Sequence, residues 1–193
     1  MVWVMKERIA ITMFGIVFLL TVSITSASLL TYYSKTIGIA EVSEPTFYAY
    51  PESVEGYNLY KLGINEPSSA SEEFSFTNGD FIGFTTDPLG ITSFYPATYT
   101  FYVKARVEDP PRNLSLELWI RNIDGDLNQL ICEAKVIVDS SGYKTYGSSC
   151  SADSLSLSES DSFYWKLYGL TTASVSYSIM VDGSMRVEVE ALG

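Results

Sequence analysis

The chain contains no histidine. A Ser-His-Asp triad, a Cys-His dyad and a histidine-ligated metal site are therefore all excluded. Serine is abundant, above all in the segment SSCSADSLSLSESDS at residues 148–162, but no histidine or lysine lies there to activate a hydroxyl as a nucleophile. The sequence thus predicts no catalytic residue and, apart from the candidate calcium loop considered below, no bound cofactor, and we expect a protein that is not an enzyme.

Positive charge is scarce. The 12 Lys and Arg residues stand against 23 Asp and Glu residues, which gives a formal net charge of −11. An acidic surface of this kind repels nucleic acid and anionic lipid. Nucleic acid is therefore excluded as a partner.

Only one long hydrophobic run occurs, at residues 9–22. It follows the charged segment KER and precedes the small-residue segment SITSAS, an order typical of a secretory signal peptide. Cleavage is expected after Ala27 or Ser28. The alternative is an uncleaved anchor, because the uncharged run continues to Leu30 and is then long enough to cross a bilayer. Both alternatives place the rest of the chain outside the cytoplasm, extracellular or at the cell surface, with membrane contact only through this segment.

Cysteine is limited to one pair, Cys132 and Cys150. In a chain exported to an oxidising compartment, such a pair predicts a disulfide. A loop of this length would contribute about 3 kcal/mol to the free energy of unfolding in the chain-entropy model. The alternative is two buried free thiols.

Alternation of apolar and polar residues predicts β-strands along most of residues 45–193. The clearest case is residues 97–108, whose odd-numbered positions are all apolar or aromatic. Short strands of this kind, separated by turn sequences such as Asp182-Gly183, indicate an all-β fold, an antiparallel β-sandwich of jelly-roll or immunoglobulin-like type. We expect a signal helix at residues 1–27, a free strand at residues 28–44 and one sandwich domain at residues 45–193. The residues expected to face the core are Ala97, Tyr99, Phe101, Val103, Ala105, Val107, Leu114, Leu116, Leu118, Ile120, Leu130, Cys132, Ala134, Val136, Val138, Phe163, Trp165, Leu167, Val175, Tyr177, Ile179, Val181, Met185, Val187, Val189 and Ala191.

Oxygen-bearing side chains alternate at Asn122, Asp124, Asp126 and Asn128. This spacing resembles the start of a calcium loop, and calcium is the one cofactor that the sequence suggests. An EF-hand loop, however, needs glycine where this chain has Leu127, and helices where this chain has strands. A hairpin turn built on Asp124-Gly125 is the favoured interpretation.

Two further surface features are predicted. Asn113 begins an N-x-S sequon after a Pro-Pro-Arg turn, which makes it a candidate glycosylation acceptor. Tyr164 and Tyr168 alternate with the core-facing residues of their strand and are expected to be exposed, where their rings would suit stacking on a sugar or burial against another subunit.

The segment after the signal has the character of a free β-strand. It is rich in β-branched and aromatic residues, with Tyr33, Ile37 and Ile39 on one face. Such a strand either completes its own sheet or adds to the sheet of a neighbouring molecule through backbone hydrogen bonds. Strands passed from head to tail do not close on themselves, so the second arrangement builds a filament.

The junction LLTYYSKTIGIAEVS, through Tyr32, Tyr33, Ser34 and Lys35, resembles the mature start of the TasA/camelysin family of exported fibre proteins and its archaeal donor-strand filament relatives. The resemblance covers roughly the first 45 residues by motif and the rest by architecture. It implies a jelly-roll-like β-sandwich whose copies polymerise with the N-terminal segment as donor strand.

Two functions follow as hypotheses from these features. The first is a structural subunit of an extracellular filament, pilus-like thread or biofilm matrix fibre, whose partners are other copies of itself in a head-to-tail homopolymer. The second is a membrane-anchored or secreted cell-surface binding module for a glycan or a protein.

Overall fold

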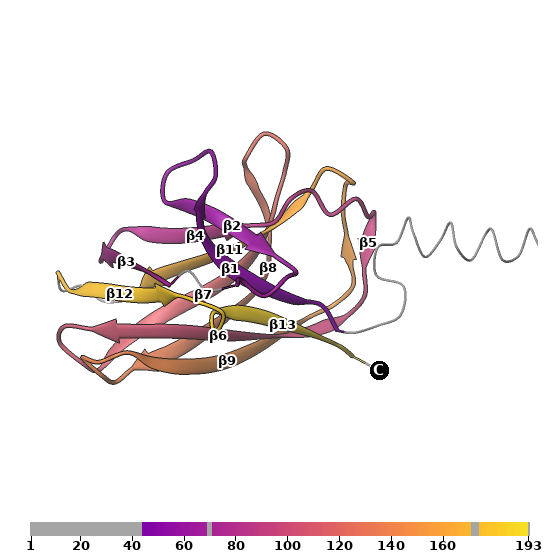
Figure 1. Cartoon of the computed structure of the whole chain (residues 1–193). Helices are drawn as coiled ribbons and strands as arrows, with labels where there is room; N and C mark the ends of the chain where they lie inside the picture. The colour runs from indigo at the N-terminus through magenta and orange to yellow at the C-terminus, as the bar shows by residue number, and fades with distance from the viewer. Residues whose placement is uncertain (1–43, 69–70, 171–173, 193) are drawn as a thin grey trace, which may run out of the picture. The chain divides into compact units, whose positions relative to one another are not determined.

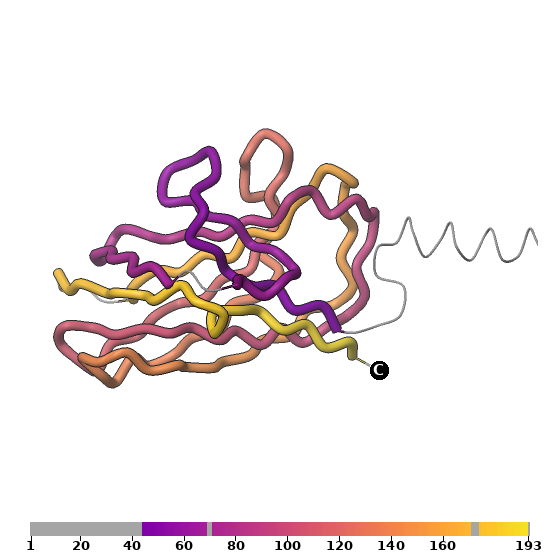
Figure 2. The backbone as a smooth tube through the Cα atoms, in the orientation of Figure 1, coloured from indigo at the N-terminus to yellow at the C-terminus, as the bar shows by residue number. Residues whose placement is uncertain are grey.

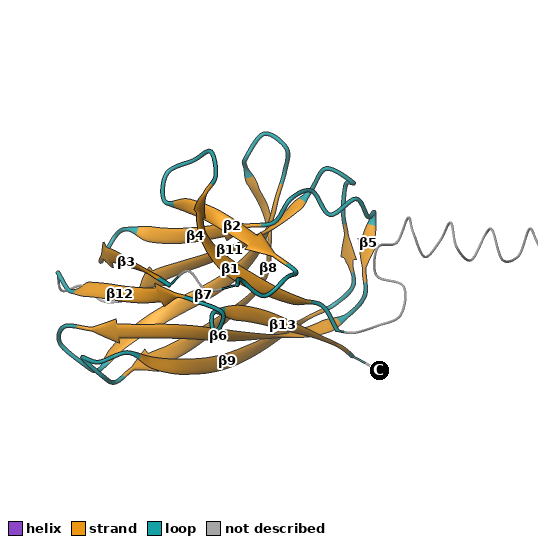
Figure 3. Cartoon of the chain, viewed as in Figure 1, coloured by secondary structure: helices purple, strands orange, loops and turns teal. Residues whose placement is uncertain are grey.

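The computed structural model describes residues 44–68, 71–170 and 174–192. The predicted signal (residues 1–27) and all but the last residue of the predicted free strand (residues 28–44) lie outside these residues, as do Tyr33, Ile37 and Ile39. The described residues form strands and loops without a helix (Figure 3). Among them, accordingly, no helix is long and apolar enough to cross a membrane.

The strands, in chain order, are β1 (Thr46–Ser53), β2 (Leu59–Gly63), β3 (Glu72–Thr77), β4 (Phe81–Thr85), β5 (Ser93–Phe94), β6 (Ala97–Val107), β7 (Arg112–Arg121), β8 (Leu127–Val138), β9 (Lys144–Ala152), β10 (Leu155–Ser156), β11 (Ser162–Gly169), β12 (Ser176–Val181) and β13 (Arg186–Ala191).

Eleven of these strands belong to one sheet, while β5 and β10 form a separate pair (Figure 1). The order in the large sheet is β3-β12-β6-β13-β1-β2-β4-β11-β7-β8, with β9 on the other side of β6. The prediction of antiparallel pairing is correct for every ladder except β2 with β4, which is parallel. The reason is that β3, which separates these two strands in the sequence, pairs with β12 and leaves β2 and β4 adjacent.

The large sheet folds over a core that is shared by two layers. The ring centroids of Tyr99 and Phe163 lie 6.4 Å apart, and those of Phe101 and Trp165 lie 5.7 Å apart. The first residue of each pair belongs to β6 and the second to β11, two strands that share no ladder. These two strands therefore lie in opposite layers whose inner side chains pack together, which confirms the predicted all-β sandwich.

The residues predicted to face the core are buried along β6, β11 and β12. The odd positions of β6 from Ala97 to Val107 are all buried. The prediction is wrong at two positions. Leu130 is 40% exposed because a bulge in β8 shifts its register against β7 and buries Ile131 instead. Ala191, the last residue of β13, is exposed.

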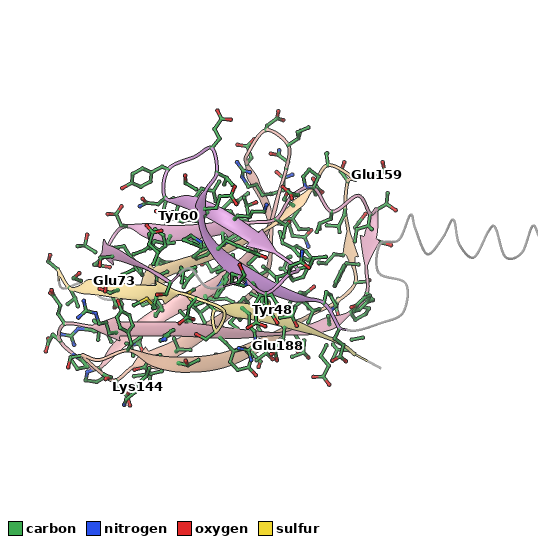
Figure 4. The ribbon with its side chains drawn as sticks, in the orientation of Figure 1. Tyr48, Tyr60, Glu73, Lys144, Glu159 and Glu188 are labelled. Carbon is green, nitrogen blue, oxygen red and sulfur yellow. A yellow bond between two sulfur atoms is a disulfide. The ribbon has the colours of Figure 1, made fainter. Side chains whose placement is uncertain are left out.

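Loops gather at one end of the domain. The turn between β1 and β2 and the turn between β7 and β8 project side by side there (Figure 2). The loop before β11 lies at the same end, where Figure 4 labels Glu159. Backbone hydrogen bonds from Leu89 to Asp161 (2.8 Å) and from Gly90 to Glu159 (3.0 Å) tie that loop to the segment after β4.

Candidate functional site

The disulfide predicted from the sequence is present and joins two outer strands. Cys132 in β8 and Cys150 in β9 are bonded, with their Cα atoms 5.9 Å apart. Within the described residues β8 has a ladder only with β7, and β9 only with β6. The sandwich is therefore closed on this side by a covalent bond and not by backbone hydrogen bonds.

A groove of about 380 Å³ opens beyond the disulfide, toward Leu127 of β8 and Ala152 of β9. We call it the edge groove. Its wall includes Leu192, which is 49% exposed, and the neighbouring Leu130 is also partly exposed. Among the residues that the structure describes, the outer edge of β8 has no ladder partner, which is the arrangement that accepts an added strand. The residues lining the edge groove are Gln129, Ile131, Ser151, Ala152, Asp153, Ser154, Leu155 and Leu192.

The four residues of the candidate calcium loop form a hairpin turn between β7 and β8. The amide of Asn122 donates to the carbonyl of Asp126 (3.0 Å), and the Asn122 Oδ1 atom accepts from the amide of Asp126 (2.8 Å). The Asn122 Nδ2 atom donates to Asn128 Oδ1 at 3.5 Å. Gly125 takes a φ of 92°, which this turn requires and glycine permits. The hairpin interpretation is confirmed.

Calcium binding at this turn stays a prediction. Asp124 makes no side-chain hydrogen bond with the described residues. The side chain of Asn122, in contrast, is engaged in hydrogen bonds within the turn. In the part of the chain that the structure describes, no three Asp, Glu, Cys or His side chains converge as metal ligands.

A second cavity lies among the loops at the end of the domain, and we call it the loop cleft. It has a volume of about 580 Å³. Strand residues and four loops contribute to it, so residues far apart in the sequence meet there. The residues lining the loop cleft are Val54, Glu55, Lys61, Thr85, Thr86, Asp87, Pro88, Arg121, Asn122, Ile123, Asp124, Ser160 and Ser162.

The outer face of β7 and β11 carries a cluster that the sequence did not single out. Glu117 is only 8% exposed, although it lies on the outer face of β7. Its carboxylate accepts hydrogen bonds from Trp119 Nε1 (2.8 Å) and from the Tyr168 hydroxyl (2.7 Å). Lys166 Nζ lies 3.9 Å from it and 4.9 Å from the centroid of the Tyr168 ring. One carboxylate therefore fixes the positions of two aromatic rings; the only hint in the sequence is the Glu-x-Trp spacing on a strand.

The predicted exposure of Tyr164 is wrong. The side chain is 6% exposed because its ring occupies the space above Gly83 of β4, where no Cβ keeps it away. Burial raises the pKa of the Tyr164 hydroxyl to about 12. Tyr168 is half-buried, so a sugar could reach only part of its ring.

Asn113 is exposed at the start of β7, as predicted. Ser115, the third residue of its sequon, is fully buried, and its hydroxyl donates to Glu133 (2.8 Å). This hydrogen bond holds the pKa of the Glu133 carboxyl below its usual range, with Lys135 adding to the effect. Glycosylation of Asn113 stays a prediction, and it would have to precede the folding of β7.

No protein-family model and no curated protein matches the chain. Solved structures with a similar fold include a CocE/NonD family hydrolase from Staphylococcus aureus, at 8% sequence identity and a TM-score of 0.58, with 77% of this chain and 36% of that chain covered. An aminopeptidase from a marine sediment Thaumarchaeota archaeon matches at 7% identity and a TM-score of 0.53, with 77% and 37% covered.

The chain therefore spans little more than a third of these enzymes. At such low identity the likeness shows the fold alone. The fold and the sites define a class of protein: an all-β sandwich domain with one disulfide, similar in fold to a part of larger hydrolases.

Proposed function

We propose that this protein is a structural subunit of an extracellular filament. Residues 28–44 of one copy would lie as an added strand on the next copy, as in the TasA/camelysin-like proteins that the N-terminal junction resembles. The observation that carries the proposal is the edge groove, where β8 has no second ladder partner among the described residues and apolar side chains are exposed.

The chemistry of the segment suits this groove. An incoming strand would form backbone hydrogen bonds with the free edge of β8. Its apolar face, with Tyr33, Ile37 and Ile39, would cover Leu192 and Leu130. Full burial of each large apolar side chain stabilises a contact by about 1.5–3 kcal/mol. Three such residues therefore offset part of the cost of ordering a short strand, about 1–2 kcal/mol per residue, and the backbone hydrogen bonds of the added strand contribute further.

The disulfide limits where the strand can bind. Adjacent strands of a sheet lie about 4.8 Å apart, so a strand inserted between β8 and β9 would hold them about 9.6 Å apart. The Cα atoms of Cys132 and Cys150 are only 5.9 Å apart. The added strand therefore binds beyond the disulfide, in the edge groove.

We infer a structural role and not a catalytic one. The chain has no histidine, and the hydrolases with a similar fold share 8% or less of its residues and extend far beyond it. Nothing in their likeness carries an active site over to this chain.

Negative-stain electron microscopy and light scattering test the proposal. Protein beginning at Ser28 is expected to form threads, whereas protein lacking residues 28–43 is expected to stay monomeric and to bind a synthetic peptide of that segment. Leu192→Asp in the edge groove should prevent threads. Its matched control is Ile137→Asp, because Ile137 is 61% exposed on β8 and does not line the groove. Threads that persist without residues 28–43, or in Leu192→Asp, contradict the proposal.

A further inference from the structure

The loop cleft combines charged groups of both signs that do not neutralise one another. Nine lysine and arginine residues lie in the described part of the chain. Seven of them form ion pairs with carboxylates. The other two are Lys61 and Arg121, and both line the loop cleft. The protein has about twice as many acidic as basic residues. The two basic side chains of the described residues that form no ion pair nevertheless lie at one site.

Three carboxylates of the same cleft also lack an ion pair within the described residues. Glu55, Asp87 and Asp124 line it and form no ion pair and no side-chain hydrogen bond with any described residue. They come from three different loops. Each of the two cations therefore lies more than 4.0 Å from each of these carboxylates, too far for an ion pair.

A hydroxyl adds to this set. Ser162, at the start of β11, lines the cleft, and its hydroxyl makes no hydrogen bond within the described residues. The oxygen atom itself is open to solvent, so it can donate to or accept from a ligand in the cleft.

The floor of the cleft is held in place by other hydrogen bonds. Thr85 Oγ1 donates to the carbonyl of Phe163 (3.2 Å), and Thr86 Oγ1 accepts from the amide of Phe163 (3.0 Å). The side chain of Asn122 holds the turn between β7 and β8. Both threonine hydroxyls are thus engaged in hydrogen bonds within the fold, which fixes the floor of the cleft. The charged side chains at the rim remain available to a ligand.

We propose that the loop cleft binds a neutral saccharide. Each sugar hydroxyl both donates and accepts, so it bonds at once to a carboxylate such as Asp124 and to a cation such as Arg121. The cleft volume of about 580 Å³ falls in the range of about 300–1,000 Å³ that is typical of small-molecule sites. Ile123, which is 77% exposed, offers an apolar surface to the C–H face of a sugar ring.

Other ligand classes fit less well. A phosphate or a nucleotide would meet three carboxylates against two cations and be repelled. A lipid or another apolar ligand would leave most of the charged rim without partners. A saccharide satisfies both signs of charge without adding a charge of its own. This inference goes beyond the filament proposal, and neither depends on the other.

Isothermal titration of the mature protein with neutral hexasaccharides of glucose, xylose and mannose tests the inference, with polygalacturonate and an acidic peptide as further probes. At least one neutral hexasaccharide is expected to bind, with little change between low and high salt. Lys61→Gln and Arg121→Gln should each weaken it about tenfold, since a hydrogen bond to a charged group contributes about that factor. Lys144→Gln is the matched control, because Lys144 is exposed and paired with Asp139 away from the cleft.

Three results would overturn the inference. The first is that none of the neutral hexasaccharides binds at millimolar concentration. The second is binding of polygalacturonate or the acidic peptide alone, lost at high salt, which makes the cleft an anion site. The third is an equal loss in Lys144→Gln. Urea unfolding of Lys61→Gln and Arg121→Gln separates lost binding from lost folding.

Discussion

Glu117 Oε2 accepts a hydrogen bond from Trp119 Nε1 at 2.8 Å, although the two residues are only two positions apart on the same strand. The bond bends the indole back along β7 and holds it beside the carboxylate. The other carboxylate oxygen accepts from Tyr168 on the neighbouring strand. A surface strand thereby gains a rigid aromatic cluster that rests on one acid.

Replacing Glu117 by glutamine should therefore loosen this cluster. The amide keeps the shape but loses the charge that strengthens both hydrogen bonds, and we expect the free energy of unfolding to fall by about 1–2 kcal/mol. Trp119 would become more mobile, and its emission should shift toward longer wavelength. Urea unfolding followed by tryptophan fluorescence measures both effects. Glu108→Gln, at an exposed acid, is the control and should change neither quantity.

Loss of the disulfide is expected to weaken the domain without changing its fold. In the Cys132→Ser, Cys150→Ser double variant the free energy of unfolding should fall by about 3 kcal/mol, because the unfolded chain regains the freedom of the closed loop. Urea unfolding with and without dithiothreitol checks this value. The reductant should destabilise the natural protein by the same amount and leave the double variant unaffected; an effect on both would point to another cause.

Asp182 should make the domain sensitive to acid. Burial acts to raise the pKa of this carboxyl, but hydrogen bonds from Lys104 Nζ (2.7 Å) and the Ser184 amide (2.9 Å) outweigh burial and lower it. A carboxyl with a lowered pKa in the folded state stabilises above its unfolded value, about 3.9, and this contribution is lost as the pH falls through the folded pKa.

The matching variant is Asp182→Asn. Its free energy of unfolding should be about 1–3 kcal/mol lower than that of the natural protein at pH 7, and the difference should shrink below about pH 3. Urea unfolding across this pH range measures it. Glu190→Gln, at an exposed acid, should show no difference at either pH. A gap between Asp182→Asn and the natural protein that is constant with pH would refute the ion-pair explanation.

Gly83 provides the space that buries Tyr164. A methyl group added at Gly83 would come within 2.6 Å of Tyr164 Cζ, so the ring must move. Gly83→Ala should lower the free energy of unfolding by about 1–3 kcal/mol, the usual effect of overpacking. The cost should be smaller in a Tyr164→Leu background, since the crowded ring is then absent. Gly142→Ala, where an added methyl meets no atom closer than 3.7 Å, is the control for thermal unfolding.

Periodicity alone could predict the fold class and most of the core. β6 follows the period throughout, because one face of the strand lies against the core along its whole length. The period fails at Leu130, where a bulge inserts one residue that no local pattern announces. It fails again at Tyr164, whose burial depends on a glycine from a strand about 80 positions earlier.

The loop cleft could not be predicted from the sequence. Lys61 and Arg121 differ from the other basic residues of the described chain only because they form no ion pair. The absence of an ion pair produces no pattern in the sequence. The pairing of β2 with β4 could not be predicted either, because it depends on β3 pairing with β12, a strand about 100 residues later in the chain. The disulfide could be predicted, because the chain has only one pair of cysteines.

The pairing of β1 with β13 affects how this chain folds while it is being made. Tyr48 lies opposite Arg186, and Thr46 lies opposite Glu188. Figure 4 labels Tyr48 on β1 and Glu188 on β13. Because β1 must wait for a partner about 140 residues later, the sheet cannot be completed until β13 has left the ribosome. Long-range pairing of this kind slows folding. Until β13 has emerged, β1 of the nascent chain can therefore pair on one side only, with β2.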